Sequence, residues 1–594
     1  MVRRIVTFVL LAGAFAATAH AAGRLPAVAR GATSVELMPR VTYEQGVQFT
    51  PHGAVAFHVI TAPRPGSANG LYALAPTLAR STVVGGRARV TQMQKELSAQ
   101  ATTAGINGDL FNEGDSHPTG IYIEGGVLKH PPATARSSIG VDSGGTVRVD
   151  RVKFFGTWRG TGQRRPLNGL NQVPKGAEAV LFTPAWGTAT PRIAGAAEIV
   201  MQQFPQTTPN TDLAATVTAA ATNGGTPIPP DGAVLMAVGT LAPKLQAEAP
   251  VGTAIASRLI LQPDWTGVVD ALGGGPALVR DRKPVFRSLE DFTSDQLTPR
   301  APRAGIGQLA DGRVILVAVD GRSRGYSVGM STFEFAQTMA RLGAVRASGV
   351  DPGDSVTVAF EGRLLNRPSD PSGERAVKEA LLVKYYGVYA PPLSPEPLGA
   401  DAAARPLALS YKVVRPSKVT AELVPPDGKS RTFEDGAAKQ PGTYTFSQPA
   451  LEGEGTWHWR VEATDDLKRQ STIDRPVRVD LTLSKLRVPA AATLKQGLTV
   501  RFSLSRAARA VLRIETKLGT PVRTLPAVQL PAGEGTVRWN ARLVGSTFAF
   551  PGTYVARVLV TSAVGTMDLG APFTLRGPAP KPPKPPKPPK PPSK

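Results

Sequence analysis

The 594-residue sequence predicts an α+β fold in which sheet dominates and helices are few. Three observations lead to this prediction. Residues 40–390 consist of short β-rich runs broken by Gly-rich turns, with few stretches of helical periodicity. Residues 404–576 alternate apolar and polar positions, which is typical of half-buried strands. Residues 577–594 repeat Lys-Pro-Pro, which removes backbone donors and favours an extended polyproline II rod.

The first 21 residues have the pattern of a cleavable signal peptide. Arg3 and Arg4 form a positive n-region, residues 5–17 are apolar, and Ala19-His20-Ala21 fits a small-x-small cleavage pattern. The apolar run is shorter than the about 20 residues that a membrane-spanning helix needs, and no later run is long and apolar enough either. We therefore expect a secreted or cell-wall-associated protein without a transmembrane segment.

The composition excludes several classes of chemistry. The chain has no cysteine, which rules out disulfides, a Cys nucleophile and thiolate metal sites. The six histidines do not cluster, and no Gly-x-Ser-x-Gly, His-Glu-x-x-His or Walker sequence is present. The formal charge of +23 favours an anionic partner. For an exported protein we expect anionic wall polymers or phosphate-containing glycans rather than nucleic acid. The alternative explanation of the charge is a general preference for Arg in a GC-rich genome.

Two helices are expected in the first 390 residues. Residues 331–342 begin with Ser331 as a possible N-cap, and Glu334 stands at the capping-box position three residues later. Apolar residues then recur on one face of this helix. A second, mostly polar helix is predicted for residues 91–100. The remainder of this part is expected to form sheet.

Two β-sandwiches are predicted in the C-terminal part of the chain. Residues 457–463 and 498–504 are examples of runs with period 2, and Gly/Pro turns separate such runs at sandwich-like spacing. We therefore expect immunoglobulin-like sandwiches over residues 404–482 and 483–576. Modules of this kind act as spacers or weak binders.

The second predicted sandwich is similar to the Ig-like domain of flagellar hook-capping proteins. Trp539-Asn540 and Pro551-Gly552-Thr553-Tyr554 carry this likeness, which implies no flagellar role. Residues 577–594 are expected to form a disordered tail. Its evenly spaced lysines favour adhesion to anionic cell-wall polymers.

Four segments concentrate Asp, Asn, Arg and Gly residues at the predicted ends of strands. The first is residues 106–112, and the second contains three consecutive glycines, Gly273 to Gly275. Such glycines let a backbone approach a ligand closely and can expose N–H groups to an anion. The third and fourth segments are residues 302–322 and 350–375. Taken singly, their Asn-Gly, Asp-Gly and Pro-Gly dipeptides are ordinary turn sequences.

In their order and spacing, these segments together resemble the phosphodiester glycosidase family. The resemblance covers about residues 55–390, and we assign residues 22–395 to this domain. It rests on Asn107-Gly108-Asp109-Leu110-Phe111, Gly273-Gly274-Gly275-Pro276, Pro302-Arg303-Ala304-Gly305-Ile306-Gly307, Val319-Asp320-Gly321-Arg322, Gly329-Met330-Ser331, Val350-Asp351-Pro352-Gly353-Asp354-Ser355 and Asn366-Arg367-Pro368-Ser369-Asp370. The resemblance implies a secreted hydrolase that cleaves glycosyl phosphodiester bonds in envelope or exopolysaccharide glycans.

The resemblance also implies a site built from carboxylates and arginines. Cleavage of a glycosidic C–O bond needs carboxylates, and the candidates are Asp109, Asp320 and Asp351, whose roles as acid, base or nucleophile stay open. Arg303 and Arg322 offer planar forks for the phosphodiester oxygens. The other expected substrate-binding residues are Asn107, Gly274, Gly275, Ser355 and Asn366.

One loop departs from the family pattern. The family has Asp-Gly-Gly-Gly-Ser where this chain has Asp351-Pro352-Gly353-Asp354-Ser355. Pro352 lacks an N–H, and Asp354 places a negative charge beside an anionic substrate. Alternatively, Asp351 and Asp354 hold a cation, for which calcium is the expected ion. A second hypothesis is therefore a catalytically impaired, wall-associated protein that binds anionic glycans.

Overall fold

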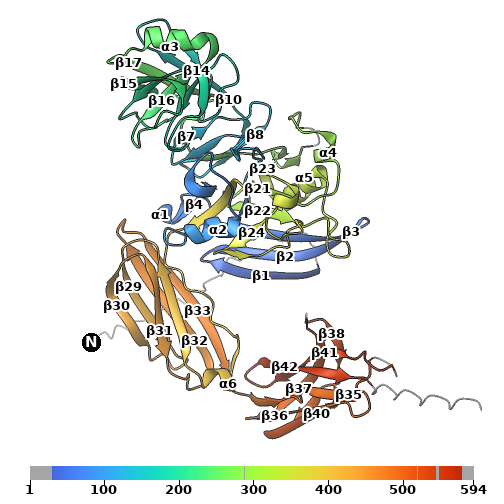
Figure 1. Ribbon diagram of the computed structural model, residues 1–594. Coiled ribbons are helices and arrows are strands. Elements are labelled where there is room, and N and C mark those ends of the chain that lie inside the picture. Colours follow the sequence, from blue (N-terminus) through green and yellow to red (C-terminus); the bar gives the residue numbers. More distant parts are fainter. Residues whose placement is uncertain (1–29, 286–287, 518, 544–546, 578–594) are drawn as a thin grey trace, which may run out of the picture. The chain divides into compact units, whose positions relative to one another are not determined.

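The computed structural model describes residues 30–285, 288–517, 519–543 and 547–577. The predicted signal peptide and the Lys-Pro-Pro repeat lie outside these residues. The chain divides into two compact units between Tyr386 and Gly387. Both units consist mainly of strands (Figure 1), which confirms the predicted α+β class dominated by sheet. No helix in the described part of the chain is long and apolar enough to cross a membrane.

The first unit is organised around an eight-stranded antiparallel sheet. Its strand order is β1-β2-β3-β22-β21-β23-β19-β20. The strands are β1 (Arg30–Met38), β2 (Val41–Thr50), β3 (Gly53–Ala62), β22 (Val314–Val319), β21 (Arg303–Leu309), β23 (Ala344–Gly349), β19 (Ala277–Arg280) and β20 (Lys283–Pro284). Every residue of β21 and β22 is buried, so these two strands form the centre of the unit.

The two helices predicted from sequence are both present. Helix α5 (Thr332–Arg341) has Ser331 as N-cap with a complete capping box to Glu334, and it packs against β19, β21 and β23 (Figure 1). Helix α2 (Val90–Glu96) ends four residues before the predicted helix does. The other helices are α1 (Ser67–Gly70), α3 (Ala242–Glu248), α4 (Ser294–Leu297) and α6 (Ala400–Ala403).

Two five-stranded sheets complete the part of the unit that forms the candidate site. The first has the order β25-β24-β5-β26-β4 and the second the order β7-β6-β18-β8-β9. The strands of the first are β25 (Arg363–Leu364), β24 (Val358–Phe360), β5 (Thr102–Asn107), β26 (Glu379–Tyr385) and β4 (Tyr72–Leu78). The strands of the second are β7 (Val127–His130), β6 (Tyr122–Glu124), β18 (Val268–Gly273), β8 (Ser137–Asp142) and β9 (Val147–Arg151).

Residues 153–262 form a further eight-stranded sheet between β9 and β18 in the chain. Its order is β11-β10-β17-β15-β14-β16-β13-β12. The strands are β11 (Arg165–Leu167), β10 (Lys153–Arg159), β17 (Ala254–Gln262), β15 (Asp212–Gly224), β14 (Arg192–Met201), β16 (Ala233–Ala237), β13 (Ala179–Phe182) and β12 (Gly169–Leu170). Its buried core includes Trp158, Leu245 and Leu259, and it supplies none of the predicted site residues.

The predicted polar segments lie where central strands begin or end. Strands β5, β18, β22 and β23 end immediately before or within these segments, and β21 begins at one of them. Arg303, the first residue of β21, pairs with Val319, the last residue of β22, and Gly305 pairs with Gly349 at the end of β23. Ala277, which follows the glycine segment, pairs with Ser348 of β23, so three of the four segments lie at the same end of these central strands.

The second unit contains two groups of strands, each with two sheets. In the first group, a sheet of order β27-β33-β32-β29-β30 accompanies the pair β28-β31. Trp459 of β32 packs against Phe446 of β31 and donates to the carbonyl of Ser410 in β28, so the two sheets face each other. The strands are β27 (Leu398–Gly399), β33 (Gln470–Asp480), β32 (Gly455–Asp465), β29 (Ser417–Val424), β30 (Arg431–Lys439), β28 (Leu407–Val413) and β31 (Gly442–Gln448).

The second group joins the sheet β34-β36-β40 to a six-stranded sheet. Buried Trp539 of β40 packs edge-on against Tyr554 and Phe573 of the opposite sheet. The strands are β34 (Leu483–Arg487), β36 (Leu498–Leu504), β40 (Gly533–Trp539), β35 (Ala491–Thr493), β42 (Thr566–Arg576), β41 (Gly552–Thr561), β37 (Ala508–Thr516), β38 (Pro521–Thr524) and β39 (Val528–Leu530). The immunoglobulin-like and hook-capping-like assignments of these groups, and the exact domain limits, stay predictions.

Candidate functional site

Asp351 is the carboxyl group best suited to proton transfer. It follows the end of β23 and is only 6% exposed. Burial raises the pKa of its carboxyl to about 7; the hydrogen bond from Ser355 opposes this shift, and the nearby Asp109 carboxylate adds to it. A group with a pKa near 7 exchanges its proton readily at neutral pH, which is the property of a general acid or base.

The backbone of Asp351 is fixed by the end of β5. The amide of Asn107 donates from Nδ2 to the Asp351 carbonyl over 2.8 Å, and the Asp351 N–H donates to the Gly108 carbonyl over 3.1 Å. The Oδ1 of Asn107 accepts from the N–H of Thr357 over 3.2 Å. Asn107 is completely buried. The structure therefore gives this predicted substrate-binding residue a positioning role for the Asp351 loop.

Ser355 connects Asp351 to a cluster of partly exposed charges. Its hydroxyl hydrogen-bonds the Asp351 carboxyl and accepts from Arg375 Nη1 over 3.3 Å. Arg375 also pairs with Glu113. The Arg375 guanidinium lies over the ring of Phe111, 5.4 Å from its centroid. The predicted residue Ser355 thus has a side-chain link to the acid and to one cation.

Asp109 forms a buried bidentate ion pair that the sequence did not indicate. Both of its oxygens accept from Arg136, each over 3.0 Å, and Arg136 also donates to Thr119 over 2.7 Å. A Cβ on Gly273 would stand 2.0 Å from Oδ2 of Asp109, and one on Gly120 would stand 2.5 Å away. These two glycines are therefore required where they are, because any side chain would displace the carboxylate.

Glu379 lies behind this ion pair and is a second functional candidate that the sequence did not indicate. It is fully buried at the start of β26, and neither carboxyl oxygen has a hydrogen-bond partner of ordinary geometry in the described residues. Burial raises the pKa of Glu379 well above its usual value, and the charge of Asp109 adds to this shift. Burial therefore favours the neutral form of the Glu379 carboxyl. In the sequence, Glu379 stands between Lys378 and the apolar run 380–383, and this pattern is the signal that could have found it.

Arg303 and Asp351 line the same pocket, which has a volume of about 190 Å³. Arg303 is buried, and its N–H groups donate to four backbone carbonyls: Met330, Gln296, Leu297 and Pro299. Burial and the positive charge of Arg322 lower the pKa of Arg303 to about 10. These contacts anchor the chain around α4, so most of the guanidinium predicted to bind phosphate is engaged by the protein.

Arg322 is paired with the residue that departs from the family pattern. Its Nη1 donates to Oδ1 of Asp354 over 2.7 Å, and Ser369 donates to the same oxygen over 2.7 Å. The side chains of Arg322 and Asp354 are 49% and 38% exposed. The φ of Arg322 is 54°, in the left-handed region that few residues adopt. Arg322, which is predicted to bind phosphate, is therefore accessible to solvent, but the carboxylate of Asp354 compensates its positive charge.

The glycine segment does not offer free donors to an anion. The N–H of Gly274 donates to the Ser137 carbonyl, and the N–H of Gly275 donates to the Gly349 carbonyl, both over 3.0 Å. The φ of Gly275 is 111°, and a Cβ there would meet Glu290 at 2.6 Å. The segment therefore allows close packing against β23 and does not form an anion-binding loop.

Asp320 is the centre of a separate buried network. It accepts from His58 Nε2 over 3.0 Å, from Tyr326 over 2.9 Å, from Asn366 over 2.9 Å and from the Arg367 N–H over 3.1 Å. Burial alone would raise its pKa, but these hydrogen bonds, led by that from His58, bring it below its usual value. Asp320 and Asn366 are thus assigned to holding the 366–370 segment against β22.

The structure therefore brings together part of the predicted set. Asp109, Asp351, Ser355, Arg303 and Arg322 surround the loop after β23, whereas Asp320 and Asn366 belong to the network around His58. Among the described residues, no group of three or more His, Asp or Glu side chains is placed to hold a metal ion. Calcium between Asp351 and Asp354 stays a prediction, and its binding would have to compete with Arg322.

Fold and site together define a mainly β domain with a buried acid beside arginines at one end of the central strands. Residues 211–384 match the family model described as phosphodiester glycosidase. This part of the chain therefore contains a phosphodiester glycosidase domain, which confirms the resemblance found in the motifs and supports a glycosidase-type function. The match includes Arg303, Asp320 and Asp351, while Asn107 and Asp109 precede it in sequence and join it through the fold.

The chain is also similar to individual proteins. It is 34% identical over 119 residues to the SPbeta prophage-derived uncharacterized protein YomE of Bacillus subtilis (strain 168), covering 20% of this chain and 18% of that protein. A hypothetical protein from Synechocystis has a similar structure, with a TM-score of 0.51, 25% identity, and coverage of 60% of this chain and 64% of that chain. For the catalytic domain of zebrafish N-acetylglucosamine-1-phosphodiester alpha-N-acetylglucosaminidase, the TM-score is 0.32 and the identity 12%, over 59% of this chain and 84% of that chain. The chain thus spans about a fifth of YomE and just under two thirds of the Synechocystis chain.

Proposed function

We propose that the protein is a secreted or cell-wall-associated hydrolase that cleaves glycosyl phosphodiester bonds in envelope or exopolysaccharide glycans. The observation that carries this proposal is the Asp351 carboxyl, with a pKa of about 7 and a place on the wall of a pocket that Arg303 also lines. The signal-peptide pattern of residues 1–21 supports export, and the Lys-Pro-Pro repeat supports a location in or near an anionic cell wall.

We assign the proton transfer to Asp351 because the carboxylate of Asp109 is held in an ion pair with Arg136. Both oxygens of Asp109 are engaged by Arg136, whereas among the described residues the Asp351 carboxyl has a side-chain hydrogen bond from Ser355 alone. A phosphate leaving group is weakly basic, so it needs little help from a general acid. Water attacks the anomeric carbon, the C–O bond to phosphate breaks with its electrons going to oxygen, and Asp351 takes the proton of the water. The products are a free sugar and a phosphomonoester.

Two partly exposed arginines touch the Asp351 loop and can meet the phosphodiester charge. Arg322 contacts Asp354 and is 49% exposed, and Arg375 contacts Ser355 and is 30% exposed. Arginine forms paired hydrogen bonds to phosphate oxygens. The 190 Å³ pocket beside Asp351 is smaller than the roughly 300–1,000 Å³ of typical ligand sites, so it suits one sugar ring and leaves the rest of the substrate outside.

The test is a panel of sugar 1-phosphodiesters incubated with the full chain, with release of free sugar and phosphomonoester measured. Turnover of at least one diester is expected, together with its loss in Asp351→Asn. Glu96→Gln is a matched control, because this exposed carboxylate on α2 lies outside the site. The absence of turnover across the panel, with and without added calcium, would contradict the proposal.

The Arg322–Asp354 ion pair favours a second candidate function. It compensates a cation that would otherwise meet phosphate, which suits a wall-associated protein that binds anionic glycans without cleaving them. This candidate predicts binding that weakens as salt rises, is reduced by deletion of residues 577–594, and persists in Asp351→Asn. Binding without any turnover on the panel would select it over the hydrolase.

A further inference from the structure

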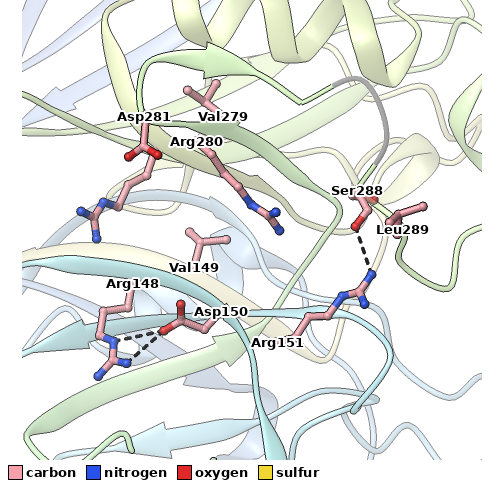
Figure 2. Close-up of a pocket in the computed structure, with 10 residues that line it drawn as sticks. Arg148, Val149, Asp150, Arg151, Val279, Arg280, Asp281, Ser288 and Leu289 are labelled. Carbon is pink, nitrogen blue, oxygen red and sulfur yellow. Dashed lines mark hydrogen bonds and ion pairs between the residues drawn. The ribbon is translucent and has the colours of Figure 1, made fainter. Parts of the chain in front are cut away.

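A large pocket lined by arginines lies apart from the Asp351 loop. Its volume is about 580 Å³, and it is lined by residues of β9, the end of β19 with Asp281, Ser288 and Leu289, and Arg346 of β23. Four arginines and two aspartates contribute to its wall. In Figure 2 the guanidinium groups of Arg280 and Arg151 extend into the same open space. The pocket therefore gathers several arginine side chains in one place on the first unit.

Three of these arginines have no carboxylate partner within the described residues. Arg151 donates to the backbone carbonyl of Ser288 over 3.0 Å, Arg346 donates to the carbonyl of Val147 over 2.9 Å, and Arg280 stands exposed without a bonded partner. The fourth, Arg148, is neutralised by Asp150 over 3.1 Å (Figure 2). Among the described lining residues, Asp281 is the one carboxylate left to offset these three charges. An anion that enters this pocket meets a net positive wall.

The arginine pocket adjoins a second pocket, which in turn adjoins the pocket of Asp351. Ser288 and Leu289 line both the arginine pocket and a neighbouring pocket of about 530 Å³. That neighbour shares Pro276, Leu297 and Thr332 with the pocket of Asp351. Shared lining residues therefore link three neighbouring pockets of the first unit, the first lined by Arg280 and the last by Asp351.

We propose that these three pockets form one track for an anionic glycan chain, with its sugar phosphates held in the arginine pocket while one glycosyl bond lies at Asp351. This inference rests on the proposed function and adds that the substrate is a polymer rather than a small diester. Among the described residues that line the arginine pocket, none is aromatic. Single-stranded nucleic acid binds by stacking bases on aromatic rings, so a sugar-phosphate chain fits this pocket better.

Binding is tested first, because it does not require turnover. Oligomers of N-acetylglucosamine 1-phosphate with one, four and eight units are titrated into the full-length Asp351→Asn protein, and affinity is followed by fluorescence anisotropy. Affinity is expected to rise with length. Adding Arg280→Glu should weaken binding of the eight-unit chain about tenfold at low salt while leaving the single unit unchanged. Asp281→Asn should strengthen it, and Arg159→Glu, an exposed arginine outside the track, is the matched control.

Turnover then separates this inference from the proposed function. In the otherwise unmodified protein, Arg280→Glu is expected to raise KM for the eight-unit chain about tenfold, and to raise KM for a single diester much less. Length-dependent, Arg280-dependent binding without any turnover would reject the hydrolase and keep the track. Affinity independent of length, equal effects of Arg280→Glu and Arg159→Glu, or equal binding of an eight-phosphate single-stranded DNA would overturn the track.

Discussion

The guanidinium of Arg322 donates to the carboxylate of Asp354 across 2.7 Å, at the mouth of the loop that carries Asp351. The family pattern has glycine at the position of Asp354, so this chain carries a built-in anion beside a cation that a phosphodiester would use. Substrate must compete with that carboxylate. Because both side chains are partly exposed, the competition is weak and adjustable by mutation.

Asp354→Gly is therefore expected to increase kcat/KM on an active sugar 1-phosphodiester by about twofold to fivefold, the worth of an exposed ion pair. The gain should shrink at high salt, where the pair is already screened. Ser369→Ala is the control, because it removes the other side-chain partner of Asp354 without removing the charge. A loss of activity in Asp354→Gly would instead indicate that Asp354 holds the loop or a cation in place.

The pH dependence of kcat/KM should report Asp351. If the carboxylate accepts the proton of water, the rate falls as Asp351 becomes protonated, so kcat/KM is expected to decrease about tenfold per pH unit below about pH 7. Ser355→Ala removes a hydrogen bond that lowers the pKa of Asp351. In this variant the fall of kcat/KM should therefore begin at a higher pH. A profile that is flat between pH 5 and 8 would exclude Asp351 as the base.

Asp351→Asn should abolish turnover and yet not destabilise the fold at alkaline pH. The folded pKa of about 7 is above the unfolded value near 3.9, so the stability that the neutral acid provides is present below about pH 4 and is lost as pH rises through 7. Asparagine does not ionise. At pH 8 the free energy of unfolding of the variant should exceed that of the parent by roughly 1–4 kcal/mol, which gives a higher denaturant midpoint. At pH 4 the two midpoints should be similar. A midpoint clearly below the parent at pH 8 would contradict the buried-acid assignment.

Glu379→Gln tests the second buried acid in the same way. The raised pKa of Glu379 means that wild-type stability declines as pH rises above about 4.3, since only the unfolded state then ionises freely. The glutamine variant should show a flatter dependence of Tm on pH between 5 and 9. Glu96→Gln, at an exposed position of α2, should leave the slope unchanged. Identical slopes for wild type and Glu379→Gln would show that Glu379 is ionised in the fold.

Gly273→Ala should disrupt the Asp109–Arg136 pair, because the new methyl group would overlap Oδ2 of Asp109. Crowding of this kind in a packed interior costs about 1–3 kcal/mol, so Tm should fall by several degrees and activity should decrease. Gly442→Ala is a matched control, since the nearest atom to its added methyl is 3.9 Å away. Wild-type Tm and activity in Gly273→Ala would mean that Asp109 can shift without consequence.

Sequence patterns predicted the strands that lead into the site better than the contacts within it. The apolar run before Asp320 and the turn sequence after Asn107 fixed where β22 and β5 end. Which polar group faces which depends on strand order across the sheets, and this order is not local information. For that reason the sequence predicts Asp320 and Asp351 alike as catalytic carboxylates. In the structure, Asp320 accepts several hydrogen bonds, whereas the Asp351 carboxyl has one from Ser355.

The partners that the sequence did not indicate are hidden for two physical reasons. Arg136 lies in a Thr-Ala-Arg-Ser stretch with no turn or helix signal, so nothing local announces that it is buried against Asp109. Glu379 begins a strand and reads as an ordinary polar end, whereas the neighbouring strands cover it completely. The glycine segment was misjudged because three glycines suggest donors for a ligand, and here β8 and β23 use those donors.

The contacts of the site join residues that are far apart in sequence, and this affects when the site can fold. Asn107 and Asp351 are 244 positions apart, His58 and Asp320 are 262 apart, and the hydroxyl of Tyr43 donates to a carbonyl 322 residues later. No nascent chain that stops short of β26 can contain a working centre. The contacts of the site can therefore form only after the whole of the first unit through β26 has been synthesised.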